Sequence, residues 1–414
     1  GIVKFRLPRF RKPAIRSWSR KRKILSSIAA VVAAVVLYTG ISLSVYVANH
    51  SADPFDQNVA TWARGHGLGF VVNRLERWRY SKPPSQKPAD ALALEADAVD
   101  SVPATSAPPP TEPSTTAAGV TAPSTTQAPT TTLPPAPTAL TPQLSPALKG
   151  EGQWRSISEL GGKTVIWATS IRPLAEYGSV VATAAVFDPS TLSAGLFNGP
   201  DIPGKGGWFN ANKVTKQALP SLMATFNGGF RLEHFKGGYI SEGRVIRKMR
   251  KDEATIGIRS DGTLAVGSWL RELPDDGSWK SLRQNLPPVV LDGKPSIDLF
   301  PGTYWGDDFH QVTFTYRSAI CRLPNGWLMY VAMGKVDINL LADALVNMGC
   351  QMAMQLDING NWPQFATFKG FGTAERKPVL LDKRMGNPAR TLRGSPKDFI
   401  GLFDPATLPP DLIK

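Results

Sequence analysis

The distribution of apolar residues divides the chain into segments of different kinds. The first is a run of 25 residues without a charge, Ile24 to Ala48. As a helix it would be long enough to cross the roughly 30 Å hydrocarbon core of a bilayer. Residues 53–80 then place aromatic and aliphatic side chains at loosely helical spacing, which predicts a short amphipathic helix.

Short apolar runs separated by Gly, Asn and Asp begin near Trp154 and predict strands. Examples are TVIWATSI, VVATAAVFD and ATFNGGF. The Asp-Gly pair within residues 256–267 predicts a hairpin with a two-residue loop. A second hairpin is expected at 317–333, around Pro324-Asn325-Gly326.

The hydrophobic period changes from strand-like to helical at residues 338–348, and this predicts a helix. Asp337 can cap its start, and Gly349 can end it. The apolar run Cys350–Leu356 follows at once and reads as a buried strand that delivers Asp357 to its carboxyl edge. We therefore expect an α/β (mixed α+β) fold for residues 151–414: one strand-rich globular domain with a mixed sheet and flanking helices.

Residues 83–150 differ in composition from the rest of the chain. Pro83 to Leu148 holds 15 prolines, many threonines and serines, and no aromatic residue. Such a segment cannot bury enough apolar surface to fold, so we expect a disordered stalk. In a polyproline-like conformation it would reach up to roughly 200 Å, at about 3.1 Å per residue.

The positive charge is concentrated before the apolar run. Residues 1–23 hold ten Lys/Arg and no acid, whereas residues 149–414 hold 31 Lys/Arg against 25 acids. The positive-inside bias predicts a cytoplasmic tail (1–23), a transmembrane helix (24–48), a juxtamembrane amphipathic segment (49–82) and an extracytoplasmic remainder. This is the arrangement of a single-pass type II protein of the cell membrane. A cleaved signal peptide would have a shorter apolar region.

Cysteine and histidine usage limits the possible metal and redox chemistry. The two thiols, Cys321 and Cys350, could pair in an exported domain, but free buried cysteine is the commoner state in apolar strands, and we favour it. No CxxC or HExxH spacing occurs, so a zinc site of familiar type is not indicated. We expect no cofactor, and leave open a structural cation such as calcium. The mildly basic folded part does not indicate nucleic acid as a partner.

Four stretches combine polar residues with a tight backbone. They are TFNGGF (225–230), KGGYISEGR (236–244), YRSAI (316–320) and MAMQLDINGNW (352–362). Each alone fits an ordinary turn or strand end. In this order, together with the helix between the last two, they resemble the phosphodiester glycosidase family across roughly Val180 to Leu402.

The resemblance rests on particular positions of this sequence. Asn227-Gly228-Gly229 matches the family's Asn-Gly-Gly turn, and Arg317-Ser318 matches its Arg-Ser/Thr strand. Asp357 matches its acid, but Ile358-Asn359-Gly360-Asn361 stands where the family has Gly-Gly-Gly-Ser. Arg390 lies in a region that resembles the family's closing Arg-Pro segment.

The activity that the resemblance implies is hydrolysis of a sugar C1–O bond whose leaving group is a phosphodiester, within a phosphate-bearing cell-envelope or extracellular glycan. It implies Asp357 as nucleophile or general base, with Glu242 or His234 as a second acid/base and Arg317 on the phosphate. The implied substrate-binding residues are Asn227, Gly228, Gly229, Arg317, Ser318, Asn359, Gly360 and Arg390.

Two other readings remain open. The departure at Ile358-Asn359-Gly360-Asn361 would also suit a catalytically altered or inactive wall-anchored module that binds phosphate-bearing glycans. A metal-dependent phosphodiesterase would need a carboxylate/histidine cluster, for which Asp307, Asp308 and His310 are the candidates.

Overall fold

The computed structural model describes residues 20–49, 55–93, 136–306 and 313–413. The chain forms two compact units, residues 1–72 and residues 73–414. The first contains helices α1 (Arg20–Asn49) and α2 (Phe55–Gly65), and helix α3 (Gly69–Tyr80) spans the boundary. By length and composition α1 could cross a membrane. The expected helix at 24–48 is confirmed, and the expected amphipathic segment is two helices instead of one.

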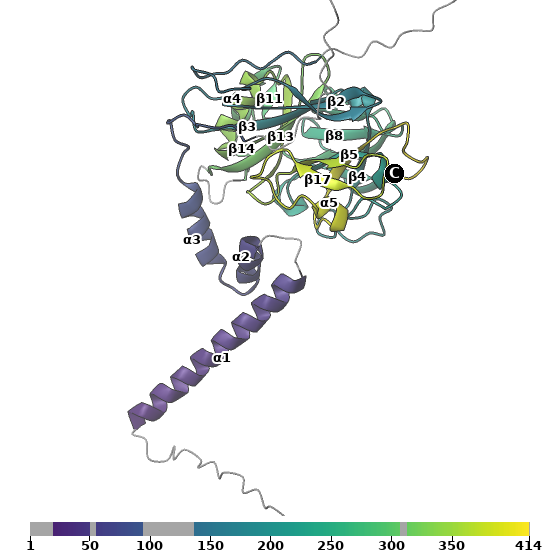
Figure 1. The fold of residues 1–414 in the computed structure, drawn as a ribbon. Coiled ribbons are helices and arrows are strands. Elements are labelled where there is room, and N and C mark those ends of the chain that lie inside the picture. The colour runs from purple at the N-terminus through teal and green to yellow at the C-terminus, as the bar shows by residue number, and fades with distance from the viewer. Residues whose placement is uncertain (1–19, 50–54, 94–135, 307–312, 414) are drawn as a thin grey trace, which may run out of the picture. The chain divides into compact units, whose positions relative to one another are not determined.

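The second unit is built from three sheets (Figure 1), whose strands pair antiparallel throughout the described residues. The only parallel contacts there are two isolated bridges. The fold class is therefore the expected α+β, but its sheets are antiparallel where we expected a mixed sheet. Many neighbouring strands are joined by hairpins, which makes them antiparallel. β14 and β15 both pair antiparallel with β13, which lies between them, so they form no parallel pair with each other.

The largest sheet has eight strands in the order β1-β2-β3-β14-β13-β15-β11-β12. These strands are β1 (Arg155–Leu160), β2 (Lys163–Ile171), β3 (Ala182–Phe187), β14 (Leu328–Val336), β13 (Thr315–Arg322), β15 (Met352–Ile358), β11 (Val290–Leu291) and β12 (Lys294–Pro295).

Two five-stranded sheets complete the unit, in the orders β7-β6-β10-β8-β9 and β17-β16-β5-β18-β4. The first comprises β7 (Arg244–Arg247), β6 (Tyr239–Ser241), β10 (Trp279–Gln284), β8 (Ala254–Arg259) and β9 (Leu264–Ser268). The second comprises β17 (Lys377–Leu380), β16 (Phe365–Lys369), β5 (Leu222–Asn227), β18 (Phe399–Phe403) and β4 (Ser193–Phe197). Short 3-10 turns lie at Pro189–Thr191, Leu219–Ser221, Leu232–His234 and Ile297–Leu299.

The eight-stranded sheet is buried on both faces. Because side chains alternate along a strand, Ile320 and Tyr330 join a core shared with the two smaller sheets, while their neighbours Ala319 and Val331 join a second core. Helix α4 (Ile338–Asn347) contributes to that second core. None of these buried clusters includes a described residue of the first unit, so the core of residues 73–414 is complete without residues 1–72.

The predicted helix and hairpins are present with one difference. Asp337 Oδ1 accepts from Leu340 N (2.8 Å) at the start of α4, and Gly349 follows its end with φ +89°. Arg259 N donates to Thr263 O (3.0 Å) and closes a β8–β9 loop of three residues, 260–262, where we expected two; Gly262 has φ +89°. The left-handed glycine supplies the extra residue of a bulged hairpin turn.

The described ends of the segment predicted as a stalk, residues 83–93 and 136–150, are hydrogen-bonded to the rest of the second unit. Ala89 N donates to Gly178 O (2.9 Å), and Leu140 N donates to Gly152 O (2.9 Å). The buried Arg172 guanidinium also donates to Pro146 O (2.9 Å). These ends differ from the expected disorder because their backbone groups find partners on the domain. Residues 94–135 lie outside the described residues, and the proposed domain boundaries stay predictions.

Cys321 and Cys350 form a disulfide, with their Cα atoms 5.7 Å apart. Our preference for free thiols was wrong. The sequence showed two apolar environments, but not that the end of β13 and the segment between α4 and β15 lie side by side at disulfide distance.

We predict that removing this disulfide destabilises the domain. Replacing both residues (Cys321→Ala with Cys350→Ala) should lower the free energy of unfolding by about 3 kcal/mol, because the bridge closes a loop over a sequence separation of 29 residues. Guanidinium-induced unfolding would measure the loss. A reductant should lower the midpoint of the native protein and leave that of the double variant unchanged; equal midpoints for the two proteins would contradict the prediction.

Candidate functional site

The candidate site lies where three strand ends meet. Asn227 ends β5, Lys397 and Asp398 immediately precede β18, and Asp357 lies near the end of β15. The backbone joins these ends directly: Asp357 N donates to Gly228 O (3.0 Å), and Gly228 N donates to Asp398 O (3.1 Å). The eight-stranded sheet is thereby fastened to the sheet that contains β5 and β18.

A bulge in β15 interrupts the side-chain alternation at Asp357. The register between β13 and β15 shifts there, so that Leu356 and Asp357 lie opposite the single residue Ser318. Ser318 Oγ donates to Asp357 O (2.8 Å) and fixes the bulged backbone. From the sequence we expected Asp357 to form a site because it lies at the carboxyl edge of a strand, but that rule describes parallel sheets. In this antiparallel sheet a bulge gives Asp357 its place in the pocket.

The Asp357 carboxylate is buried against a lysine. Its Oδ2 forms a salt bridge with Lys397 Nζ, and its Oδ1 accepts from Ile358 N (3.0 Å). The exposed fractions are 5% for Asp357 and 8% for Lys397. Burial lowers the pKa of the Lys397 ammonium, and the neighbouring Asp357 opposes that shift. This is a desolvated ion pair, whose charges act more strongly than a surface pair would.

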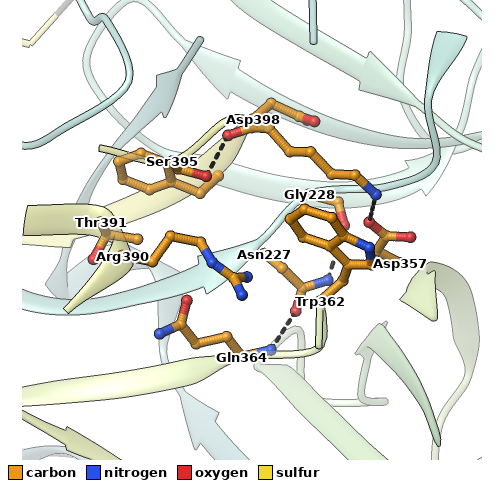
Figure 2. Close-up of a pocket in the computed structure, with 11 residues that line it drawn as sticks. Asn227, Gly228, Asp357, Trp362, Gln364, Arg390, Thr391, Ser395 and Asp398 are labelled. Atoms are coloured by element: carbon orange, nitrogen blue, oxygen red, sulfur yellow. Dashed lines mark hydrogen bonds and ion pairs between the residues drawn. The ribbon is translucent and has the colours of Figure 1, made fainter. Parts of the chain in front are cut away.

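A tryptophan contacts both cations of the pocket. The Trp362 ring centroid is 3.9 Å from Lys397 Nζ and 4.9 Å from the Arg390 guanidinium carbon. Figure 2 shows the Trp362 indole beside Asp357, with the Arg390 guanidinium pointing into the same space. Arg390 comes from helix α5 (Arg390–Arg393), and its Nη2 donates to Asn361 O (2.5 Å).

Asn227 organises the floor of the site through both ends of its amide. Its Nδ2 donates to Gly228 O (2.9 Å) and Ser318 Oγ (3.1 Å). Its Oδ1 accepts from Tyr330 Oη (2.9 Å) and Gln364 N (2.9 Å). An asparagine amide has two donors and two acceptor positions, and all are used inside the protein. Asn227 therefore positions the strand ends, and the structure gives it no free group for a sugar hydroxyl.

A second buried ion pair explains the two glycines of the Asn-Gly-Gly turn. Arg283 Nε donates to Asp398 Oδ2 (2.8 Å), and both side chains are 0% exposed. A Cβ on Gly228 would lie 2.2 Å from Asp398 Oδ2, and one on Gly229 would lie 2.9 Å from Asn285 Cγ and 3.1 Å from Arg283 Cζ. Only glycine lets the turn pack against this pair.

These groups enclose a cavity of about 10 Å³, which is room for roughly one water molecule. Its lining consists of Asn227, Gly228, Asp357, Trp362, Gln364, Arg390, Thr391, Ser395, Lys397, Asp398 and Phe399.

The structure gathers part of the predicted site. Asn227, Gly228, Asp357 and Arg390 line the cavity, and Ser318 bonds to two of them. Gly229 lies behind the turn, against Arg283 and Asn285.

Other predicted residues lie elsewhere. Arg317 is fully buried, and its guanidinium donates to Val336 O (3.0 Å), Trp305 O (2.7 Å), Thr313 O (2.9 Å) and Gln355 Oε1 (2.8 Å). Its predicted contact with phosphate is therefore not available, because these donors serve the protein interior. Glu242 accepts from Asn210 N (2.8 Å) outside the pocket, and His234 is exposed.

Asn359 and Gly360 also fall outside the cavity lining. Asn359 turns the chain with φ +80°, and its N donates to Tyr316 O (2.8 Å). The alternative metal ligands Asp307, Asp308 and His310 lie outside the described residues. Within the part of the chain that the structure describes, no group of three or more His, Cys, Asp or Glu could hold a metal ion.

The sequence reasoning missed Lys397, Trp362 and the Arg283–Asp398 pair. Lys397 and Asp398 stand next to each other before an apolar strand, which reads as an ordinary polar strand start. Trp362 closes the stretch Asn359-Gly360-Asn361-Trp362, and its aromatic ring beside a polar turn was the available signal.

Comparison with known proteins gives distant structural similarities. No model of a known protein family and no curated protein matches the sequence. The fold is similar to the catalytic domain of zebrafish N-acetylglucosamine-1-phosphodiester α-N-acetylglucosaminidase, auto-inhibited by its pro-peptide. That match has 20% identity and a TM-score of 0.40, and covers 61% of this chain and 87% of that one. A hypothetical protein from Synechocystis matches at 11% identity and a TM-score of 0.38, over 59% of this chain and 63% of that one. These similarities concern the fold, and the chemistry has to come from the side chains of the pocket.

We predict that Gly228→Ala destabilises the domain by about 1–3 kcal/mol, because the new methyl group must displace the buried Asp398 carboxylate. Thermal or denaturant unfolding would measure the change. Gly360→Ala is the matched control, since no atom lies within 4 Å of a Cβ at that position. Equal losses in the two variants would contradict the assigned packing.

Proposed function

We propose that the domain hydrolyses the C1–O bond of a sugar-1-phosphodiester in a cell-envelope or extracellular glycan. The observation that carries the proposal is the buried Asp357 carboxylate, held by Lys397 and sharing one pocket with the Arg390 guanidinium. The order of the motifs, which resembles that of phosphodiester glycosidases, supplies the reaction class.

The charges of the pocket suit this reaction. An ionised phosphodiester is already a good leaving group, so the enzyme needs little general acid and no second free carboxylate. Asp357 supplies the nucleophile or the general base. Lys397 and Arg390 supply positive charge for the phosphate, and the planar guanidinium can donate two parallel hydrogen bonds. Arg390 thus takes the part that the sequence assigned to Arg317.

The size of the cavity favours the general-base alternative. About 10 Å³ beside Asp357 accommodates one water and no sugar ring. The sugar would have to displace the Trp362 indole, so that its C1 comes next to the water that Asp357 activates in the cavity. This route inverts the anomeric configuration, whereas attack by Asp357 itself would retain it.

The proposed location is the outer face of a cell membrane, with α1 as a single-pass type II anchor. The ten Lys/Arg of residues 1–23 support a cytoplasmic N-terminus. The Cys321–Cys350 disulfide supports an oxidising compartment for the domain.

A second candidate is a binding module that no longer turns over the glycan. The observation that favours it is the closed pocket: Lys397 already pairs with Asp357, and the turn that carries Trp362 departs from the family's glycines. Saturable binding of a phosphate-bearing glycan without release of sugar would support this candidate.

We predict that Asp357→Asn lowers kcat/KM on sugar-1-phosphodiesters by about 10²–10⁴-fold, because the amide cannot act as a base or a nucleophile. Asp275→Asn, on an exposed loop, is the matched control and should retain full activity. Nuclear magnetic resonance of the first-formed sugar should show inversion. Undiminished turnover in Asp357→Asn would exclude the assigned role, and turnover only with added divalent metal would favour a phosphodiesterase.

We predict that activity falls on the alkaline side at a lower pH than an ordinary lysine would give. Burial lowers the pKa of Lys397, so its ammonium, which holds Asp357 and faces the phosphate, loses its proton earlier as pH rises. In Lys397→Arg the guanidinium stays charged, and the decline should move to higher pH or vanish. Profiles of kcat/KM against pH would test this; an identical alkaline limb in both proteins would rule out Lys397 as its source.

A further inference from the structure

An exposed surface that is both basic and apolar lies outside the cavity lining. It consists of Phe209, Val245, Ile246, Lys248, Arg250 and Lys251, and is called here the β7 surface. Its apolar members are 48%, 62% and 39% exposed, respectively. Residues 244–251 hold five Lys/Arg and no acid. Glu242 precedes them and accepts from Phe209 N (3.2 Å), while Asp252 and Glu253 follow, and Glu253 pairs with Arg250 at 3.9 Å.

Val245 and Ile246 of this surface belong to β7, an edge strand whose backbone is held in place. β7 is the last strand of its sheet, and a register shift inserts Ile246 opposite β6 without a partner residue. Arg247 Nη1 donates to Phe235 O (2.8 Å) and ties the strand to the loop before β6. Arg244 lies 3.8 Å from the Trp208 ring, and its Nη1 donates to Gly206 O (2.8 Å). Val245 and Ile246 therefore stand on an anchored backbone.

Protection of an open sheet edge explains the cations and the bulge of this surface, but not its exposed apolar side chains. Lysine, arginine and a bulge all discourage pairing with another strand. They do not call for exposed Phe209, Val245 and Ile246, which cost hydrophobic free energy in water. Apolar side chains flanked by Lys and Arg are the combination that binds the interface of an anionic bilayer, where the cations meet lipid phosphates and the apolar groups enter the acyl boundary.

We infer that the β7 surface docks the domain onto an anionic lipid membrane. The inference rests on the proposed membrane location. Residues 50–72 lie between α1 and the second unit, and even fully extended they span at most about 80 Å. Such a short tether keeps the effective concentration of lipid high, so a weak docking surface suffices. A soluble polyanionic glycan would use the cations but not the three apolar side chains.

The test measures vesicle binding by residues 73–414, whose core is complete without the anchor. Phosphatidylglycerol–phosphatidylcholine vesicles should sediment this unit, more weakly as salt rises, and pure phosphatidylcholine should not. Removing three charges together (Lys248→Gln, Arg250→Gln and Lys251→Gln) should weaken binding at least about tenfold. Separately, Val245→Ser with Ile246→Ser should weaken it without altering net charge.

The matched control removes three exposed lysines elsewhere (Lys149→Gln, Lys163→Gln and Lys294→Gln) and should bind vesicles like the native unit. If vesicle binding weakened equally in this control, net charge alone would explain the weaker binding of the charge variant, and the proposal would be overturned. Binding of soluble polyphosphate that depends on the cations but not on Val245 and Ile246, with no binding to vesicles, would also overturn it. Because Asp357→Asn should still dock and the β7 variants should still hydrolyse small substrates, failure of docking and failure of the proposed activity remain distinguishable.

Discussion

The buried ion pair between Arg283 and Asp398 is the constraint on which the site depends. Both side chains are 0% exposed, so each charge has lost its hydration and relies on its partner. Burial raises the pKa of Asp398, and the Arg283 guanidinium opposes that shift. Loss of either partner would leave an uncompensated buried charge, at a cost of about 3–5 kcal/mol.

The same pair fixes the positions of the groups that line the cavity. Arg283 lies on β10 and Asp398 lies just before β18, so their contact joins two sheets. The residue before Asp398 is Lys397. Adjacent side chains of an extended chain point in opposite directions, so when Asp398 points to Arg283 the Lys397 side chain points to Asp357. The Gly228-Gly229 turn can then close over the pair only because it has no side chains. What resembles a substrate-binding signature is thus, in this structure, a packing requirement of the ion pair beside the site.

The sequence predicted local features well, because local rules determine them. Helix α4 with its Asp337 cap follows from the hydrophobic period and from capping chemistry. Asp357 was recognised as a candidate because an acid that directly follows an apolar run can be identified from the sequence alone. Arg317 was misassigned because its acceptors, Val336 O and Trp305 O, come from other segments of the chain. Lys397 and Trp362 were missed for the same reason: what makes them notable is their contact with each other. The bulge at Asp357 depends on the register with β13, which no pattern within β15 reveals.

The proline- and threonine-rich segment has a different consequence from the one its composition suggested. Ala89 and Leu140 both hydrogen-bond to the second unit, on either side of residues 94–135. The described ends of the predicted stalk, residues 83–93 and 136–150, therefore belong to the second unit. The chain that connects α1 to the second unit is instead residues 50–72, which contain helix α2. A lipid-docking surface on the second unit would act within the reach of this connection, at most about 80 Å when fully extended.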